Sequence, residues 1–242
     1  MYVIRLKTIL RALGALILCI CLLVLGSAVL CRKSAVQPAL SVLRPGDFLL
    51  LLDAGHGGLD GGAVSASGTA EAEINLAITL KTQAFLRFLG ISGALTRTDG
   101  QSLQFNPEAT ARENKNADLR ARLELAKARP ELDFLSIHLN KFEQEQYYGA
   151  QVFYSRNTER SKVLAQCLQD CLRCVLDQHN DRRIKMAPDS IMLMKNIHAP
   201  AVTIECGFLS NPREEALLKQ DGYQTKIALA IAGGYIQYLD SK

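Results

Sequence analysis

The chain has 242 residues, of which 48% are hydrophobic and 21% charged, a composition typical of a globular protein and not of a disordered one. Its formal net charge is +4, but Arg5, Lys7 and Arg11 lie in residues 1–31, which contain no acid, so residues 32–242 carry only +1. A nearly neutral domain without tryptophan lacks the basic patch and the stacking surface of nucleic-acid-binding proteins, so we expect no nucleic-acid partner.

The N-terminal segment, residues 1–31, contains a run without charge from residue 12 to residue 31, preceded by basic residues. As a helix rising ~1.5 Å per residue, such a run can cross a bilayer core of about 30 Å. A cleavable signal peptide is the alternative, because residues 26–28 (GSA) offer the small residues of a cleavage site. The length of the run favours an uncleaved membrane anchor. We expect a linker at residues 32–47 and one catalytic domain at residues 48–242.

Beyond the linker, apolar runs of strand length alternate with amphipathic helical segments. We predict strands at residues 48–53, 91–97, 134–138, 150–154 and 201–205. We predict helices at residues 71–89, 118–129, 158–177 and 223–239, and a polar loop at residues 98–115. This alternation predicts a single α/β domain with a mostly parallel or mixed sheet flanked by helices on both faces.

Three of the predicted strands end at or beside a polar residue. His56 follows the first of them in a glycine-rich loop, and His138 and Glu205 end two others. Because ligands of α/β sheets bind at the carboxyl ends of the strands, we expect these side chains to share one site. Glu205 interrupts an apolar run, where an ionised carboxylate is costly unless it is paired or bound to a metal.

Glu71, at the start of the first predicted helix, completes a set of zinc-ligand residue types. Two histidines and one glutamate leave a fourth zinc position for water, whose pKa the metal lowers to ~7. A further carboxylate must then transfer the proton. We predict one Zn²⁺ ion bound by His56, Glu71 and His138, with Glu205 as the catalytic acid and base. Taken singly, each residue also has a structural explanation; a carboxylate at a helix N-terminus, for example, stabilises the helix by ~0.3–1 kcal/mol.

Six short motifs occur in order along the domain: residues 52–62 (LDAGHGGLDGG), 71–77 (EAEINLA), 95–99 (LTRTD), 118–122 (DLRAR), 136–140 (SIHLN) and 205–212 (ECGFLSNP). Together they resemble the N-acetylmuramoyl-L-alanine amidases of the zinc-dependent Amidase_3 family of bacterial cell walls. The resemblance implies hydrolysis of the amide between N-acetylmuramic acid and L-alanine of peptidoglycan stem peptides. It places the metal ligands on His56, Glu71 and His138 and the catalytic glutamate on Glu205.

Within this family the chain resembles the germination-specific type of the spore cortex. The shared features are the single N-terminal apolar segment, the strand at residues 149–154 and the segment at residues 191–196. This type removes stem peptides so that muramic-δ-lactam can form in the cortex. The resemblance therefore implies peptidoglycan as partner and an extracytoplasmic domain, membrane-anchored or secreted, in a spore-forming bacterium.

Three further residues, Asn75, Arg97 and Asn140, lie within the motifs and are predicted to bind substrate. For Asn75 and Arg97, structural hydrogen bonding explains the residue equally well. The polar stretch at residues 98–115 is a candidate gate over the site, and a gated site would require an accessory protein as a further partner.

Two other functions stay open at this point. The predicted zinc site is equally compatible with a peptidase that cuts within the stem peptide. A non-catalytic wall-binding protein is the alternative from another class, and the intact set of ligands and catalytic carboxylate argues against it.

Overall fold

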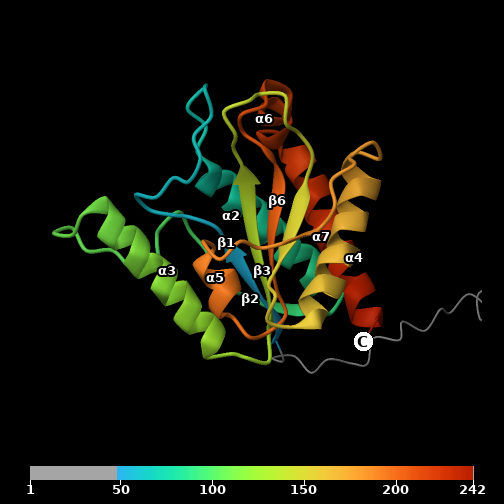
Figure 1. Ribbon diagram of the computed structural model, residues 1–242, viewed down its shortest axis with the longest axis horizontal. Helices are drawn as coiled ribbons and strands as arrows, with labels where there is room; N and C mark the ends of the chain where they lie inside the picture. The colour runs from blue at the N-terminus through green and yellow to red at the C-terminus, as the bar shows by residue number, and fades with distance from the viewer. Residues whose placement is uncertain (1–47, 242) are drawn as a thin grey trace, which may run out of the picture. The chain divides into compact units, whose positions relative to one another are not determined.

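A six-stranded mixed sheet organises residues 48–241, the part of the chain that the computed structural model describes. The strands are β1 (Phe48–Ala54), β2 (Ser92–Leu95), β3 (Asp133–Asn140), β4 (Gln151–Tyr154), β5 (Lys185–Met186) and β6 (Ala201–Phe208). Their order is β2-β1-β3-β6-β4-β5 (Figure 1). The first four strands in this order pair in parallel, whereas β4 pairs antiparallel with β6 and parallel with β5. The predicted mixed sheet is confirmed.

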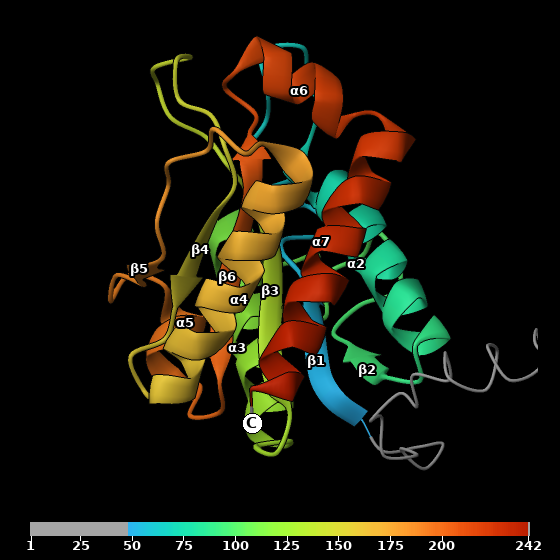
Figure 2. The same ribbon diagram turned by 90° about the vertical axis from the view of Figure 1, so that its right-hand side faces the viewer.

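Helices cover both faces of the sheet, as predicted. One face carries α2 (Glu71–Phe88), α4 (Glu159–Leu176) and α7 (Asp221–Asp240), and the other carries α3 (Ala111–Lys127) and α5 (Met192–Asn196). Figures 1 and 2 show these two layers with the sheet between them. The short helix α6 (Pro212–Leu218) follows the carboxyl end of β6.

Strand β1 is apolar at every position except Asp53 because both of its faces are buried. On β1, Leu50 and Leu52 face the core beneath α2, α4 and α7, whereas Leu51 between them faces the core beneath α3 and α5. Side chains alternate across a strand, so a strand buried on both sides cannot show polar alternation. The polar residues of such strands are therefore confined to places where a specific partner or the site accommodates them.

The predicted loop at residues 98–115 ends too late, because α3 already begins at Ala111. Thr110 and Glu113 form a capping box, in which each side chain accepts the backbone N–H of the other residue. Hydrophobic periodicity misses this start because the first residues that α3 buries are polar. They are Asn114, Asp118 and Arg122.

Three short elements, α5, α6 and β5, were not predicted. The first turn of α6 shows the local signal that was available: the Asn211 side chain accepts the N–H groups of Arg213 and Glu214, and Pro212 occupies the first helical position. Elements of two to seven residues are too short to establish a periodicity, and tertiary packing decides them.

The predicted membrane segment, residues 1–31, and the linker, residues 32–47, lie outside the described residues. Within residues 48–241, no helix has the length and hydropathy needed to cross a bilayer. The membrane anchor therefore stays a prediction from the sequence.

A buried ion-pair network joins α3 to the end of β1. The guanidinium of Arg122, which is 2% exposed, donates from Nη1 to Oδ1 of Asp53 at 2.5 Å and from Nε to Oδ2 of Asp118 at 2.7 Å. Burial alone would raise the pKa of Asp53, but the charge of Arg122 and the hydroxyl of Ser136 outweigh it and hold that pKa below its usual value. Asp53 is thus a stable anion that depends on Arg122.

We expect Arg122→Met to lower the free energy of unfolding by about 3–5 kcal/mol, because it leaves two buried carboxylates unpaired. Urea denaturation measures this loss. Arg120→Met is the matched control, since Arg120 is exposed on the same helix and its replacement should change stability by less than about 0.5 kcal/mol. Equal losses in the two variants would contradict a stabilising role for the network.

Candidate metal and catalytic site

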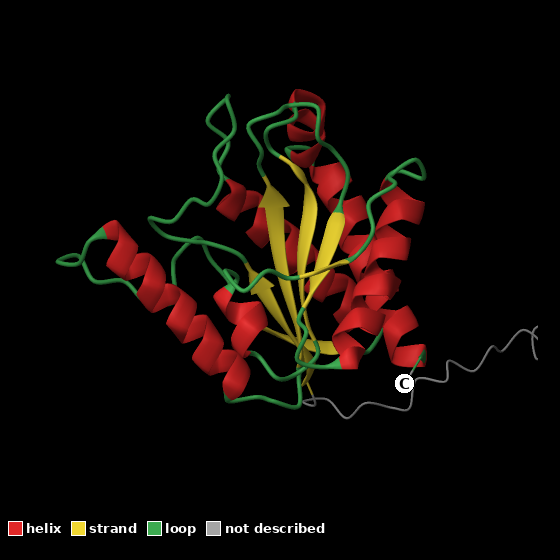
Figure 3. Ribbon diagram, viewed as in Figure 1, coloured by secondary structure: helices red, strands yellow, loops and turns green. Residues whose placement is uncertain are grey.

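The three predicted metal ligands, His56, Glu71 and His138, meet at the carboxyl ends of β1 and β3, beside the first turn of α2. One potential ligand atom from each lies within 4.8 Å of the others. The two imidazole rings are 5.0 Å apart between centroids and inclined at 79°. Loops gather at this end of the strands (Figure 3). The side chains of His56 and His138 are 18% and 22% exposed, so the cluster can be reached from solvent.

Glu71 is the central residue of this cluster and is only 3% exposed. Its Oε1 faces Nδ1 of His138 at 3.0 Å and accepts the N–H of Leu139 at 3.0 Å. Its Oε2 accepts the N–H of Ala63 at 2.8 Å and lies 3.4 Å from Nε2 of His56. Burial raises the pKa of Glu71, but the two histidines outweigh it and hold the pKa well below the usual value. The carboxylate is therefore anionic and fixed in place, as a metal ligand requires.

His56 is oriented through its other ring nitrogen. Nδ1 lies 2.8 Å from Oδ2 of Asp60, which in turn lies 3.2 Å from Nζ of Lys115. Burial lowers the pKa of His56, but its contacts with Asp60 and Glu71 raise it to about 9. A carboxylate on the distal nitrogen fixes the ring and leaves the other nitrogen to bind a metal. Sequence reasoning assigned no role to Asp60, although a carboxylate four residues after His56 was the available signal.

The backbone of His56 has a φ of +61°, which is unusual for a residue other than glycine. Two buried arginines hold this loop. Arg122 donates to the carbonyls of Ala54 and His56 at 2.7 and 2.6 Å, and Arg97 donates to those of Ala54 and Gly55 at 2.9 and 3.1 Å. Charged donors on these carbonyls stabilise a conformation that is otherwise costly.

Arg97 and Asn75 are predicted substrate contacts, and this role stays a prediction; in the structure both side chains make hydrogen bonds within the protein. Arg97 is 5% exposed and its guanidinium is occupied by backbone carbonyls. Asn75 is fully buried, and its Nδ2 donates to Glu71 Oε1 at 3.1 Å and to the Gly55 carbonyl at 3.3 Å. Both side chains are buried, and Asn75 Oδ1 has no hydrogen-bond partner within residues 48–241.

Asn140, the third predicted substrate contact, lies at the end of β3 and is half-buried. Its Oδ1 accepts the N–H of Lys141 at 2.8 Å, and its carbonyl accepts the N–H of Leu209 at 2.8 Å. The second of these contacts joins the ends of β3 and β6. Binding of substrate by Asn140 stays a prediction.

Gly55 and Gly62 allow the side chains of His138 and Glu71 to lie close to the backbone of the loop that carries His56. A Cβ on Gly55 would lie 2.7 Å from Nδ1 of His138 and closer still to Cε1 and Nε2. A Cβ on Gly62, whose φ is +70°, would lie 2.6 Å from Oε2 of Glu71. Backbone without side chains thus forms the wall of the site on this side.

Glu205 lies directly across the sheet from His138, since these residues are partners in the parallel register of β3 and β6. Its Oε2 is buried and is one of only two buried side-chain polar atoms without a hydrogen-bond partner within residues 48–241. Burial raises the pKa of Glu205 to about 7, although the charge of His138 opposes the shift. A carboxyl group with this pKa can both accept and return a proton near neutral pH.

A bulge in β6 follows Glu205. The register advances by two residues on β3, from His138 to Asn140, but by three on β6, from Glu205 to Phe208. Glu214 on α6 stabilises the bulge by accepting the N–H of Phe208 at 2.8 Å. Bulges beside a site set the direction of neighbouring side chains, and this one ends the regular pairing just after Glu205.

The fold and the site together define the class of protein. An α/β sheet presents two histidines and a glutamate at the carboxyl ends of its strands, with a separate, unpartnered carboxylate beside them. This is the arrangement of a hydrolase that can use a metal ion. The chain belongs to the Amidase_3 family of N-acetylmuramoyl-L-alanine amidases, whose family model matches residues 50–237.

Individual relatives agree with this assignment. The germination-specific N-acetylmuramoyl-L-alanine amidase of Bacillus subtilis (strain 168) is 35% identical over 80% of this chain and 81% of its own. The solved structure of the CwlD amidase from Clostridioides difficile, in complex with the GerS lipoprotein, is 44% identical and superimposes with a TM-score of 0.77, covering 81% of this chain and 100% of that one. An N-acetylmuramoyl-L-alanine amidase structure from Clostridium difficile 630 is 28% identical, with a TM-score of 0.69 and coverage of 81% and 98%.

Proposed function

We propose that the chain hydrolyses the amide between N-acetylmuramic acid and L-alanine with one Zn²⁺ ion held by His56, Glu71 and His138, and with Glu205 as the catalytic acid and base. One observation carries this proposal: three ligand residue types meet within 4.8 Å, and the unpartnered Glu205 carboxyl lies on the adjoining strand. Nitrogen and carboxylate donors in this number are the donor set of catalytic zinc.

When bound, zinc supplies Lewis acidity toward the scissile carbonyl and toward a water molecule. The residues of the chain have separate tasks around it. Asp60 and Glu71 fix the two imidazoles. Glu205 accepts the proton of the attacking water at its unpartnered oxygen and returns it to the nitrogen of L-alanine as the C–N bond breaks. The products are the lactyl carboxylate and the free amine of the stem peptide.

We further propose that this reaction takes place outside the cytoplasm, in the spore cortex, and that the N-terminal segment anchors or exports the domain. The similarity to the germination-specific relative and the apolar run at residues 12–31 support this role. The CwlD amidase was solved in complex with a lipoprotein, which supports an accessory protein for this chain as well.

Digestion of purified peptidoglycan followed by mass spectrometry tests the reaction. Intact stem peptides that begin with L-alanine are the expected products. Shortened stems that remain on muramic acid would identify a peptidase instead, and an unchanged polymer, with and without the accessory protein, would indicate a wall-binding protein. Metal analysis of the same sample tests the zinc, because a protein that never retains zinc would contradict the metal site.

Asp60→Asn is expected to weaken zinc binding about 10–100-fold, because the amide no longer polarises and orients His56 through Nδ1. Competition with a fluorescent zinc chelator measures the affinity. Asp181→Asn removes an exposed carboxylate elsewhere and serves as the control. An Asp60 variant with wild-type affinity would show that His56 does not depend on this contact.

A further inference from the structure

The loop at residues 141–149, between β3 and β4, borders the candidate site. Figures 1 and 2 show it as an arch beyond the carboxyl end of β3, near α6. Phe142 comes four residues after His138, and four residues span at most about 14 Å. Gln151, just after the loop, is the register partner of Glu205 on β6. Side chains of the loop are therefore within reach of the sugars next to the scissile amide.

Two exposed aromatic rings of this loop, Phe142 and Tyr147, pack over a buried third ring, Phe208. The exposed rings meet edge to face at 5.1 Å between centroids, and Phe142 lies 5.2 Å from Phe208. Arg182 lies over Phe208, 4.5 Å from the ring centroid, and donates to Oε1 of Gln151 at 3.1 Å. Phe142 and Tyr147 remain 44% and 38% exposed. The protein thus orders two aromatic side chains beside the site without covering them.

The loop is bonded to the rest of the domain along its length. Residues 141, 142, 145, 148 and 149 make hydrogen bonds of 2.6–3.1 Å to Val64, Ser210, Asn211, Arg182 and Glu214, respectively. A surface that is ordered in advance loses little conformational entropy when a ligand binds. Exposed aromatic side chains on such a loop are typical of a binding surface.

The charge of the loop limits the ligand. Lys141 contributes one positive charge and Glu143 and Glu145 two negative charges, so residues 141–149 carry a net charge of −1. Both glutamates are exposed, and they repel the carboxylates of a stem peptide and the headgroup of an anionic lipid. A glycan strand is neutral where its lactyl carboxyls are consumed in amides. The C–H groups on the faces of its sugar rings pack against aromatic rings by dispersion.

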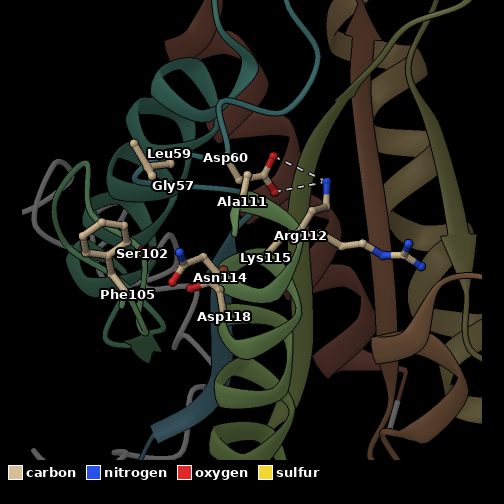
Figure 4. Close-up of a pocket in the computed structure, with 10 residues that line it drawn as sticks. All are labelled: Gly57, Leu59, Asp60, Ser102, Phe105, Ala111, Arg112, Asn114, Lys115 and Asp118. Carbon is tan, nitrogen blue, oxygen red and sulfur yellow. Dashed lines mark hydrogen bonds and ion pairs between the residues drawn. The ribbon is translucent and has the colours of Figure 1, made fainter. Parts of the chain in front are cut away.

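The cavity beside His56 does not offer such a surface. It measures about 250 Å³ and lies between the loop that carries His56 and the start of α3 (Figure 4). Asp60 and Lys115 are paired with each other there, and the side chain of Arg112 points out of the cavity. Phe105 is the only aromatic side chain among the described residues that line it. The adjoining pair of rings is thus a feature of the loop at residues 141–149.

We propose that the glycan strand of peptidoglycan binds over Phe142 and Tyr147, with the faces of its sugar rings against these side chains. The inference rests on the proposed amidase reaction. The sugar that carries the scissile amide lies at the metal site, and the strand continues over the loop at residues 141–149. The two rings therefore favour substrates with several sugars over single muramyl peptides, and they set the direction of the strand across the site.

Phe142→Trp tests glycan binding directly, because the chain contains no tryptophan and the new side chain keeps an aromatic face. Glycan strands stripped of their stem peptides are titrated into the full-length variant. The expected result is a saturable shift of the tryptophan emission to shorter wavelength. Phe88→Trp is the matched control, since Phe88 is 88% exposed at the end of α2 farthest from Glu71, and its emission should not change. No response of Phe142→Trp, or equal responses of the two variants, would overturn the proposal.

Glycan length provides a second test that needs no new reporter. Two substrates with the same stem peptide are compared, one with a single muramic acid and one with several sugars. Replacing both Phe142 and Tyr147 by Leu should raise KM for the longer substrate about fivefold and leave KM for the shorter one within about twofold. Phe88→Leu should change neither value, and thermal unfolding shows that the double variant is folded. Equal changes of KM for the two substrates would contradict the proposal.

The two tests separate this inference from the reaction itself, because stripped strands contain no scissile amide. Saturable binding by a protein that never cleaves peptidoglycan would refute the reaction and support the glycan surface. Cleavage by the double variant with the wild-type ratio of KM values would refute the surface and leave the reaction intact. An emission shift caused by an accessory lipoprotein and not by glycan would identify a protein interface instead and overturn the proposal.

Discussion

Glu205→Gln is expected to bind zinc like the wild type and to cleave peptidoglycan about 10²–10⁴-fold more slowly. The substitution keeps the size of the side chain but removes its ability to accept a proton. Glu205 lies on β6 opposite His138, and none of the potential ligand atoms in the His56, Glu71 and His138 cluster belongs to it. The Glu205→Gln substitution should therefore lower kcat and leave the zinc content unchanged.

Metal analysis and stem-peptide release, measured on the same preparation, check this expectation. Glu159→Gln is the control, because Glu159 is exposed at the start of α4, at the end of β4 that lies away from the site. If the Glu205 variant loses zinc, Glu205 contributes to the metal site. If it retains both zinc and wild-type turnover, another group transfers the proton.

Gly55→Ala is expected to reduce zinc affinity by at least about tenfold and turnover with it, although only one methyl group is added. The new Cβ would overlap the His138 ring, 2.7 Å from Nδ1 and closer to two other ring atoms. The ring must rotate or the loop must move, and the arginine contacts to Ala54 and His56 oppose movement of the loop. The side chain of His138 should therefore be displaced from Glu71.

Gly61→Ala provides a control in the same loop. A Cβ on Gly61 would meet only the Ala70 methyl, at an ordinary contact distance of 3.6 Å. This variant should keep zinc and activity, and thermal unfolding of both variants shows whether the fold is intact. Normal zinc affinity in folded Gly55→Ala protein would mean that the close contact with His138 is not required for metal binding.

The sequence by itself determined the type of fold and indicated which residues meet at the candidate site. Continuous apolar runs followed by polar residues predicted parallel strands with a site at their ends, and β1, β3 and β6 have this form. This succeeded because strand burial and the placement of His138 and Glu205 depend on local patterns. The motifs from His56 to Glu205 also predicted the family, which the match over residues 50–237 confirms.

The tertiary structure alone decided how these residues are held. Arg97 and Arg122 donate hydrogen bonds to the backbone of the His56 loop, in which His56 has a positive φ. They can do so only because α3 and the segment after β2 pack beside β1. Asp60 becomes the partner of His56 through the turn of a glycine-rich loop, which no periodicity describes. The early start of α3 was missed because it buries polar side chains, whose partners lie far away in sequence. Contacts of this kind depend on distances in the folded chain, and residue order does not specify those distances.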